Sequence, residues 1–462
     1  MQTTATLAAP AAPARAPRPR AAARAAAAPW TPYHAALVVM VLTFVWRVQD
    51  LFPLLGKFRP AILSSLLALG FFLLGPVGLA PARLRHPVFR WALAFLAVAV
   101  LSVPAGIFPG NSFRFLTDDH LKTVLFAVLL LCAVRSVADV ERFVAVHVVG
   151  GALYCVMILV RYDVGPDGRL GGLVYYDAND LAMLVVCTFP LLVYLTRPGS
   201  RWLLRLVAVA AMGLFVVTII KTGSRGGFLG LVAVFGTMLV GFRAVPKAQR
   251  LGALGAVMLV LAVAGGSGYW KKMETILRPQ EDYNWGGNRE TGRVEVWKRG
   301  MGYMLQRPLL GVGAANFPVA EGRISPLAGR QELGQGLKWS AAHNSFVQVG
   351  AELGVPGLLA FLLLLFAAFR ATRALGRSRA PDGSVPDAAA LGQALTATLV
   401  GYCVAGFFLS QGYSAYLYTI LALVAGLSAV SGAGAAPAAE PRPPSARRPL
   451  GRGGLVVGSR AA

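Results

Sequence analysis

Residues 341–357, Ala-Ala-His-Asn-Ser-Phe-Val-Gln-Val-Gly-Ala-Glu-Leu-Gly-Val-Pro-Gly, mark the point where the character of the chain changes. They close a long polar segment, residues 268–344, and open an apolar run that is long enough to cross a bilayer. A histidine and an asparagine therefore stand where water meets hydrocarbon, in a chain with five histidines. This position predicts a membrane fold and suits chemistry on a substrate that is half lipid and half polar.

The composition of the whole chain is that of a membrane protein. Of its 462 residues, 56% are hydrophobic and 14% are charged, whereas soluble domains carry about a quarter charged residues. The formal net charge is +24, but the basic residues fall in short clusters between apolar runs, which argues against nucleic-acid binding. The cysteines lie inside apolar runs and lack disulfide or metal-site spacing: Cys132, Cys155, Cys187 and Cys403.

Twelve apolar runs are candidates for membrane-spanning helices, which need about 20 mostly apolar residues each. The runs are apolar on all sides rather than striped, as expected of helices embedded in lipid. The sequence thus predicts an all-α integral membrane protein with about twelve transmembrane helices, nine in residues 31–267 and three in residues 345–431. The runs are centred near residues 42, 70, 97, 129, 151, 187, 211, 234, 259, 358, 400 and 422.

The distribution of Lys and Arg predicts the orientation, because cytoplasmic loops are enriched in basic residues. With the N-terminus inside, 24 basic residues fall in the tails and cytoplasmic loops and eight in the short loops opposite. Residues 268–344 then lie outside the cytoplasm, and their tryptophans and helix-compatible stretches predict a small, partly helical cap. Residues 1–30 and 432–462 are Ala-, Pro- and Arg-rich, and we expect disordered basic cytoplasmic tails rather than a signal peptide.

Arginines on the predicted outer face are candidate phosphate ligands. Arg225 is flanked by glycines, which let a ligand approach the backbone closely. A guanidinium group binds phosphate in bidentate fashion, with two parallel N–H···O hydrogen bonds. Arg289 and Arg293 are four residues apart and share one face if their stretch is helical, so that with Arg225 they could clamp a pyrophosphate. The alternatives are an arginine that extends to lipid head groups and a solvated helix face with Glu290 and Glu295 as counter-charges.

His343 is the candidate general base, since an imidazole accepts a proton from a hydroxyl near neutral pH. Asn344 follows it directly, and the alternative for His343 is a capping histidine in a structural turn. Glu352 is expected in the first turns of the tenth span, where a carboxylate is costly unless it is paired or functional. An ion pair with an arginine is the alternative for Glu352.

Asp118-Asp119-His120 supports a competing hypothesis. Adjacent carboxylates beside a histidine could hold a divalent cation for a metal-dependent lipid-phosphate glycosyltransferase. Acidic residues are also favoured at a helix N-terminus, and we expect no metal site. Asp177 and Asp180 are expected to cap the sixth span and to order the loop before it. The chain has no GxxxxGK[ST] loop, which argues against a nucleotide-linked donor.

These motifs together resemble the O-antigen ligase/polymerase family of bacterial envelope glycan enzymes. The resemblance covers about residues 165–370, and Ala178 departs from it because related proteins often have proline there. The motifs that carry it are Tyr-Asp-Ala-Asn-Asp-Leu-Ala (176–182), Thr-Gly-Ser-Arg-Gly-Gly (222–227), Arg293 with Trp297, Arg-Pro-Leu-Leu-Gly-Val-Gly (307–313), and His343-Asn344 followed by Glu352-Leu-Gly and Gly357.

The resemblance implies a metal-independent, inverting glycosyltransferase of the GT-C type in the bacterial inner membrane, with no cofactor. Its donor would be a glycan on undecaprenyl pyrophosphate, presented at the periplasmic face. Arg225 and Arg293, or Arg289 in its place, would hold the pyrophosphate, and His343 would act as general base. Asn344, Glu352, Asn179 and Asp177 would support them.

The motifs leave the acceptor open. A ligase would transfer the glycan to lipid A–core, a polymerase to another lipid-linked repeat, and an oligosaccharyltransferase to a protein hydroxyl. Two hypotheses from other classes are a multispan solute or bicarbonate transporter and a catalytically silent scaffold. Transporters place ionisable groups near mid-membrane, whereas the charged residues here cluster at the predicted outer boundary.

Overall fold

The computed structural model describes residues 29–75, 78, 81–166, 168–281, 285, 290, 292–329, 340–380 and 385–432. In this part of the chain the regular structure is helical, beside one isolated antiparallel bridge between Val164 and Leu170. Apart from residues 29, 30 and 432, the two predicted tails lie outside the described residues. The predicted fold class, an all-α protein, is confirmed for the described residues.

The helices follow one another in this order: α1 (Pro32–Met40), η1 (Val41–Val45), α2 (Val48–Leu51), α3 (Pro53–Lys57), α4 (Pro60–Leu74), α5 (Pro81–Leu84), α6 (Pro87–Ala105), α7 (Pro109–Phe115), η2 (Leu116–His120), α8 (Leu121–Ala133), α9 (Val137–Arg161), α10 (Ala178–Leu195), α11 (Trp202–Thr222), α12 (Arg225–Gly241), α13 (Lys247–Ala264), α14 (Ser267–Glu274), η3 (Pro279–Glu281), α15 (Arg293–Gln306), α16 (Phe317–Arg323), α18 (Ser345–Arg377), α19 (Asp387–Gly406) and α20 (Ala415–Val430).

Each of the twelve predicted span centres falls within a helix. Among the described residues, seven helices are long and apolar enough to cross a membrane, which makes this a multi-pass membrane protein: α6, α9, α10, α11, α13, α18 and α19. The other predicted spans correspond to shorter apolar helices. Helix α4, for example, has 15 residues, about 22 Å at 1.5 Å per residue, against a hydrocarbon core of about 30 Å. The count of twelve crossings therefore stays a prediction.

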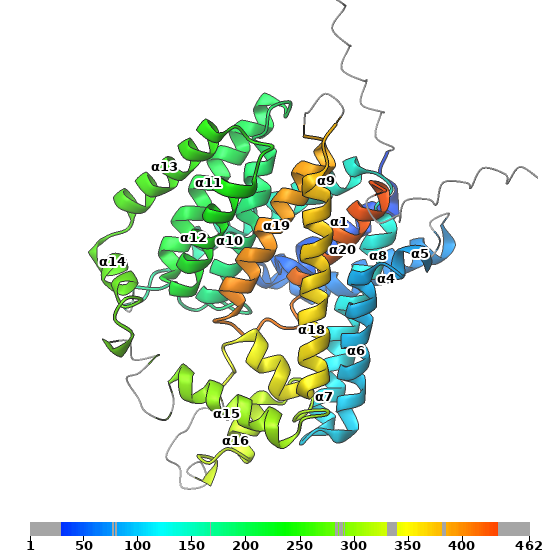
Figure 1. Cartoon of the computed structure of the whole chain (residues 1–462), viewed down its shortest axis with the longest axis vertical. Helices are drawn as coiled ribbons and strands as arrows, with labels where there is room; N and C mark the ends of the chain where they lie inside the picture. The colour runs from blue at the N-terminus through cyan, green and yellow to red at the C-terminus, as the bar shows by residue number, and fades with distance from the viewer. Residues whose placement is uncertain are drawn as a thin grey trace, which may run out of the picture.

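Helix α10 lies at the centre of the bundle, and 89% of its 18 residues are buried inside the protein. Its neighbours are α11, α12 and α19, and the long helix α18 runs beside α6 over much of the height of the molecule (Figure 1). Because α10 is surrounded by protein, its apolar residues form core contacts rather than a lipid-facing surface. The loop that follows α19 is therefore held close to the start of α10.

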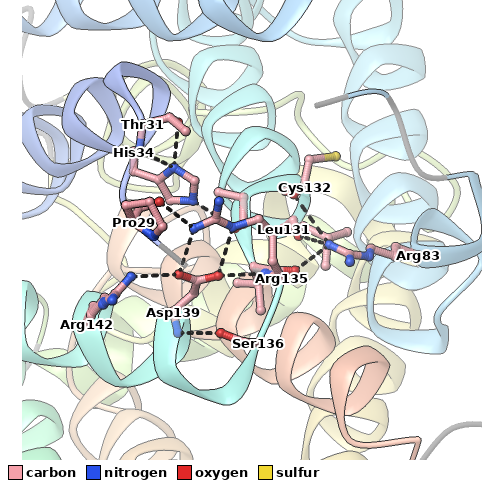
Figure 2. Close-up of polar contacts among 12 residues, drawn as sticks. Pro29, Thr31, His34, Arg83, Leu131, Cys132, Arg135, Ser136, Asp139 and Arg142 are labelled. Carbon is pink, nitrogen blue, oxygen red and sulfur yellow. Dashed lines mark hydrogen bonds and ion pairs between the residues drawn. The ribbon is translucent and has the colours of Figure 1, made fainter. Parts of the chain in front are cut away.

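One end of the bundle, predicted to be cytoplasmic, is held by basic residues that bind carbonyls and carboxylates (Figure 2). Asp139 on α9 is 1% exposed and accepts hydrogen bonds from Arg135 and Arg142. Arg83 donates to the carbonyls of Leu131 (3.1 Å) and Val134 (2.6 Å), at the end of α8. Cationic side chains stabilise a helix C-terminus in this way because its last carbonyls lack partners.

The opposite end carries α15 and α16, two described helices of the predicted cap, residues 268–344 (Figure 1). Nδ2 of Asn111 on α7 donates to Oδ1 of Asn316, at the start of α16. The two cap helices are joined by buried Glu321, which accepts hydrogen bonds from Nε of Arg299 (2.9 Å) and from the hydroxyl of Tyr303 (2.7 Å). The cap is also attached to the bundle, because Ile107 donates its N–H to the carbonyl of Val312. The cap is thus folded and docked, while its periplasmic location stays a prediction.

Candidate active site

The loop between α19 and α20, residues 407–414, contacts the segments that carry Arg225, Arg293 and His343. His343 donates its backbone N–H to Oγ of Ser410 over 2.8 Å. The φ angle of His343 is +48°, a left-handed conformation that costs free energy in a residue with a side chain. Asn344 then caps α18, because its Oδ1 accepts from the N–H groups of Phe346 (2.9 Å) and Val347 (3.0 Å). The pair is thus fixed between the helix start and the loop.

Helix α15 brings Arg293 to the same place. Arg293 is the first residue of α15, and Trp297 follows one turn later. The indole N–H of Trp297 donates to the carbonyl of Ala342 over 3.0 Å, directly before His343. The Trp297 ring lies 5.2 Å from the ring of Phe407. The start of α15 is therefore attached both to the turn that carries His343 and to the 407–414 loop.

Helix α12 approaches this loop from another direction. Arg225 is the first residue of α12, and Ser224 caps the helix by accepting the N–H of Gly227 over 3.1 Å. Nη1 of Arg225 donates to Oγ1 of Thr275 over 2.8 Å. A Cβ atom on Gly226 would lie 3.1 Å from Cβ of Phe408, so the start of α12 packs closely against the 407–414 loop.

The structure thus gathers Arg225, Arg293 and His343 around one loop, each half-buried and each on a different element. Both arginines stand at helix N-termini, where unpaired N–H groups and the helix dipole favour an anion. Guanidinium groups at two such ends form a setting suited to a phosphate-bearing ligand. Arg289, the predicted alternative to Arg293, lies outside the described residues.

Glu352 is buried and joins separate segments by hydrogen bonds; among the described residues it does not form an ion pair with an arginine. Its carboxylate, 1% exposed, accepts hydrogen bonds from the N–H groups of Ala315 (3.0 Å) and Phe317 (3.3 Å) and from the hydroxyl of Tyr413 (2.9 Å). These partners satisfy the desolvated carboxylate, as burial requires. Glu352 therefore joins α18 to the cap and to the 407–414 loop.

Gly311 of the Arg-Pro-Leu-Leu-Gly-Val-Gly motif and Gly354 of Glu352-Leu-Gly allow this junction to pack closely. Gly354 interrupts α18 with φ +69°, and a Cβ there would lie 2.4 Å from the carbonyl oxygen of Pro308. Gly311 has φ +61°, and its Cβ would lie 2.4 Å from the carbonyl oxygen of Ala351. Backbone hydrogen bonds join the two segments of the chain. The N–H of Val355, for example, donates to the carbonyl of Pro308. The cap is therefore seated directly on the kink of α18.

The chain is similar in sequence to known proteins. Residues 210–362 match the family model described as O-antigen ligase. This part of the chain resembles the O-antigen ligase family. The matched residues contain Arg225, Arg293, His343 and Glu352, so the predicted resemblance is confirmed for the part of the chain that carries the site. Members of this family are membrane-bound glycan ligases or glycosyltransferases.

A curated relative is more distant. The chain is 20% identical over 261 residues to an uncharacterized protein from Haemophilus influenzae. The similarity spans 54% of this chain and 64% of that protein. The chain thus covers less than two thirds of the relative's length.

A residue outside the matched O-antigen ligase region also reaches the 407–414 loop. Asp177 is the N-cap of α10, as predicted, and its Oδ1 accepts from the N–H groups of Asn179 (2.7 Å) and Asp180 (2.8 Å). Asp180 in turn accepts a 2.8 Å hydrogen bond from the side chain of Gln411. The Tyr-Asp-Ala-Asn-Asp-Leu-Ala motif is thus connected to the 407–414 loop through Asp180, which was predicted to cap the sixth span and to order the loop before it.

Asp118, Asp119 and His120 are not arranged as a metal site. His120 is 1% exposed and its ring packs against the rings of Phe115 and Tyr413. Asp118 is exposed and pairs with Lys122 at 3.9 Å. Throughout the described residues, no three His, Cys, Asp or Glu side chains form a group that could hold a metal ion.

A cavity of about 470 Å³ adjoins the 407–414 loop. Sequence reasoning did not predict it, because its lining comes from segments spread over most of the chain. Polar and charged lining residues include Arg47, Asp118, Asp119, Lys122, Tyr175, Gln348, Ser410 and Gln411. The apolar lining includes Phe44, Ile62, Leu66, Leu69 and Leu125.

Proposed function

We propose that the protein transfers a glycan from undecaprenyl pyrophosphate to an acceptor hydroxyl at the periplasmic face of the bacterial inner membrane. The observation that carries the proposal is the convergence of Arg225, Arg293 and His343 on the 407–414 loop. Two cations and one base then lie on separate, rigidly held elements at the junction of cap and bundle.

The two arginines hold the pyrophosphate leaving group. Negative charge grows on the pyrophosphate as its bond to the sugar breaks, and preorganised donors stabilise that charge most in a site from which water is excluded. Arg225 and Arg293 supply full positive charges, and the N-termini of α12 and α15 add their N–H groups. The arginines carry the charge that a divalent cation would otherwise carry, so the mechanism uses neither metal nor cofactor.

His343 acts as general base on the acceptor. Its imidazole takes the proton of the acceptor hydroxyl while the hydroxyl oxygen forms a bond to the anomeric carbon of the donor. The bond between that carbon and the pyrophosphate oxygen breaks, and its electron pair leaves with undecaprenyl pyrophosphate. Attack opposite the leaving group inverts the configuration of the anomeric carbon.

Aromatic rings from the cap and the bundle cover this site. The Trp285 ring lies 5.3 Å from the ring of Trp297 and 6.3 Å from that of Phe408. Trp297 also contacts Phe407. These rings exclude water, which would otherwise compete with the acceptor and hydrolyse the donor.

The test uses the full chain in proteoliposomes with lipid-linked glycan and membrane glycolipid from the host bacterium. Arg225→Ala, Arg293→Ala and His343→Asn are compared with Arg278→Ala, an arginine of the predicted cap that is 59% exposed and pairs with Glu274. We expect the three site variants to lose transfer and Arg278→Ala to retain it. Transfer at the wild-type rate in the site variants would overturn the proposal, and intact solute uptake in them would favour the transporter hypothesis.

A further inference from the structure

We propose that Gln411 and Asp180 are positioning residues for the transfer reaction, and that they act through the backbone conformation of His343. The inference rests on the proposed function, in which His343 is the base. It is carried by a series of contacts that leads from helix α10, through residues 410 and 411 of the 407–414 loop, to the backbone of His343.

The peptide unit between Ala342 and His343 is held on both of its edges. Its carbonyl accepts the indole N–H of Trp297 over 3.0 Å, and its N–H donates to Oγ of Ser410 over 2.8 Å. Asn344, directly after His343, is fixed as the cap of α18. These contacts maintain the left-handed φ of +48°, a strained conformation that persists only where its surroundings hold it. The direction of the His343 side chain therefore depends on the position of Ser410.

The residues on either side of Ser410 are themselves fixed to helices. Oγ of Ser345, the first residue of α18, donates to the carbonyl of Leu409 over 2.8 Å and accepts the N–H of Gln411 over 3.0 Å. The carbonyl of Gln411 accepts the hydroxyl of Tyr402 on α19 over 2.7 Å. Ser410 is thus held between two residues that α18 and α19 keep in place.

The side chain of Gln411 adds α10 to this arrangement. Its amide donates to Oδ1 of Asp180 over 2.8 Å. The other carboxylate oxygen of Asp180 accepts the N–H of Asp177 over 3.2 Å, which fixes the carboxylate at the start of α10. Because α10 is packed inside the bundle, it provides a rigid attachment for the loop. Gln411 and Asp180 therefore set the place of Ser410 and, through it, the turn at His343.

A reciprocal exchange of side chains tests this contact. Gln411→Glu removes the amide donor and brings a second carboxylate to the 2.8 Å contact with Asp180, where like charges repel. The double variant Asp180→Asn/Gln411→Glu reverses the hydrogen bond instead. The new amide at position 180 donates to the new carboxylate at position 411, and its oxygen still accepts the N–H of Asp177.

Gln411→Ala is compared with Gln393→Ala as the matched control. Gln393 is 8% exposed and also joins distant segments, since it accepts the N–H of Ala244 (3.1 Å) and donates to the carbonyl of Gly376 (2.9 Å). It lies near the start of α19, whereas the 407–414 loop follows the end of that helix. The control therefore removes a comparable glutamine without altering the loop.

We expect Gln411→Glu and Gln411→Ala to lower kcat by about tenfold or more, because misplacing a reacting group by about 1 Å can cost about 10² in rate. KM for the lipid-linked donor stays unchanged, since the proposed donor ligands lie on other elements. The double variant regains kcat, and Gln393→Ala keeps the wild-type kcat even where its unfolding temperature falls. The rates are measured in proteoliposomes with host lipid-linked glycan and membrane glycolipid, and thermal unfolding is measured in detergent.

Any one of three results would overturn the proposal. Wild-type kcat in Gln411→Glu would show that the contact with Asp180 does not act on the base. Failure of the double variant to regain kcat would show that the loss does not arise from this contact. An equal loss of kcat in Gln393→Ala would reduce the effect to general destabilisation. Each result differs from failure of the proposed function, in which the variants of the two arginines and of His343 retain transfer.

Discussion

Tyr413 donates its phenolic hydroxyl to Oε2 of Glu352 over 2.9 Å, across the junction between the 407–414 loop and helix α18. The same carboxylate accepts N–H groups from Ala315 and Phe317 of the cap. One buried side chain thus ties together the three parts of the protein that surround the proposed site.

Glu352→Ala is expected to destabilise this junction. The substitution leaves two backbone N–H groups and a phenol without their acceptor, and an unsatisfied buried group costs about 1–3 kcal/mol. Glu352→Gln keeps one acceptor oxygen and should be milder. Thermal unfolding in detergent measures both, and equal stability of Glu352→Ala and wild type would show that the carboxylate does not hold the cap in place.

His343→Asn is expected to reduce transfer by about 10² or more, the usual contribution of a general base. Asparagine adopts left-handed backbone conformations readily, so this variant keeps the turn at φ +48° while it removes the imidazole. Membrane insertion and unfolding temperature serve as controls. If the variant transfers glycan at the wild-type rate, His343 is not the base.

Arg225→Lys and Arg293→Lys are each expected to lower kcat/KM by at least about tenfold, although they conserve charge. A lysine cannot form the paired hydrogen bonds that guanidinium makes with phosphate. Kinetics of the single and double variants provide the measurement. If both arginines contact one pyrophosphate, the double variant loses less than the sum of the two single losses in free energy; strictly additive losses would place them on separate ligands.

Gly354→Ala is expected to destabilise the protein by about 1 kcal/mol or more, because its φ of +69° is strained for alanine and its Cβ would lie 2.4 Å from the carbonyl oxygen of Pro308. Gly70→Ala on α4 is the control, since nothing lies within 4 Å of the added Cβ. Thermal unfolding should separate the two variants. Equal unfolding temperatures would mean that the kink is not needed for the cap to dock.

Chelation is expected to leave transfer intact, because the proposed mechanism offsets the leaving-group charge with arginines. The measurement is the initial rate of glycan transfer in proteoliposomes before and after treatment with EDTA. Loss of activity on chelation and its recovery with Mg²⁺ would direct attention to Asp118 and Asp119 and contradict the assignment of charge stabilisation to Arg225 and Arg293.

Much of the architecture could be predicted because hydropathy is a local property of the chain. Every predicted span centre lies in a helix, and Asp177 caps α10 as its position before an apolar run indicates. The motifs around Arg225, Arg293 and His343 were also recognisable, because each is a short contiguous stretch. The exact number of crossings does not follow from hydropathy, since helices such as α4 are shorter than the apolar core.

The sequence alone determined the membrane class, the positions of the helices and the residues that we propose for the chemistry, because these depend on runs of neighbouring residues. Only the tertiary structure decided what brings them together. The 407–414 loop has no reactive motif, yet it contacts His343 through Ser410 and Asp180 through Gln411. Such contacts join residues more than 60 positions apart, and the packing of whole helices rather than any local pattern selects them.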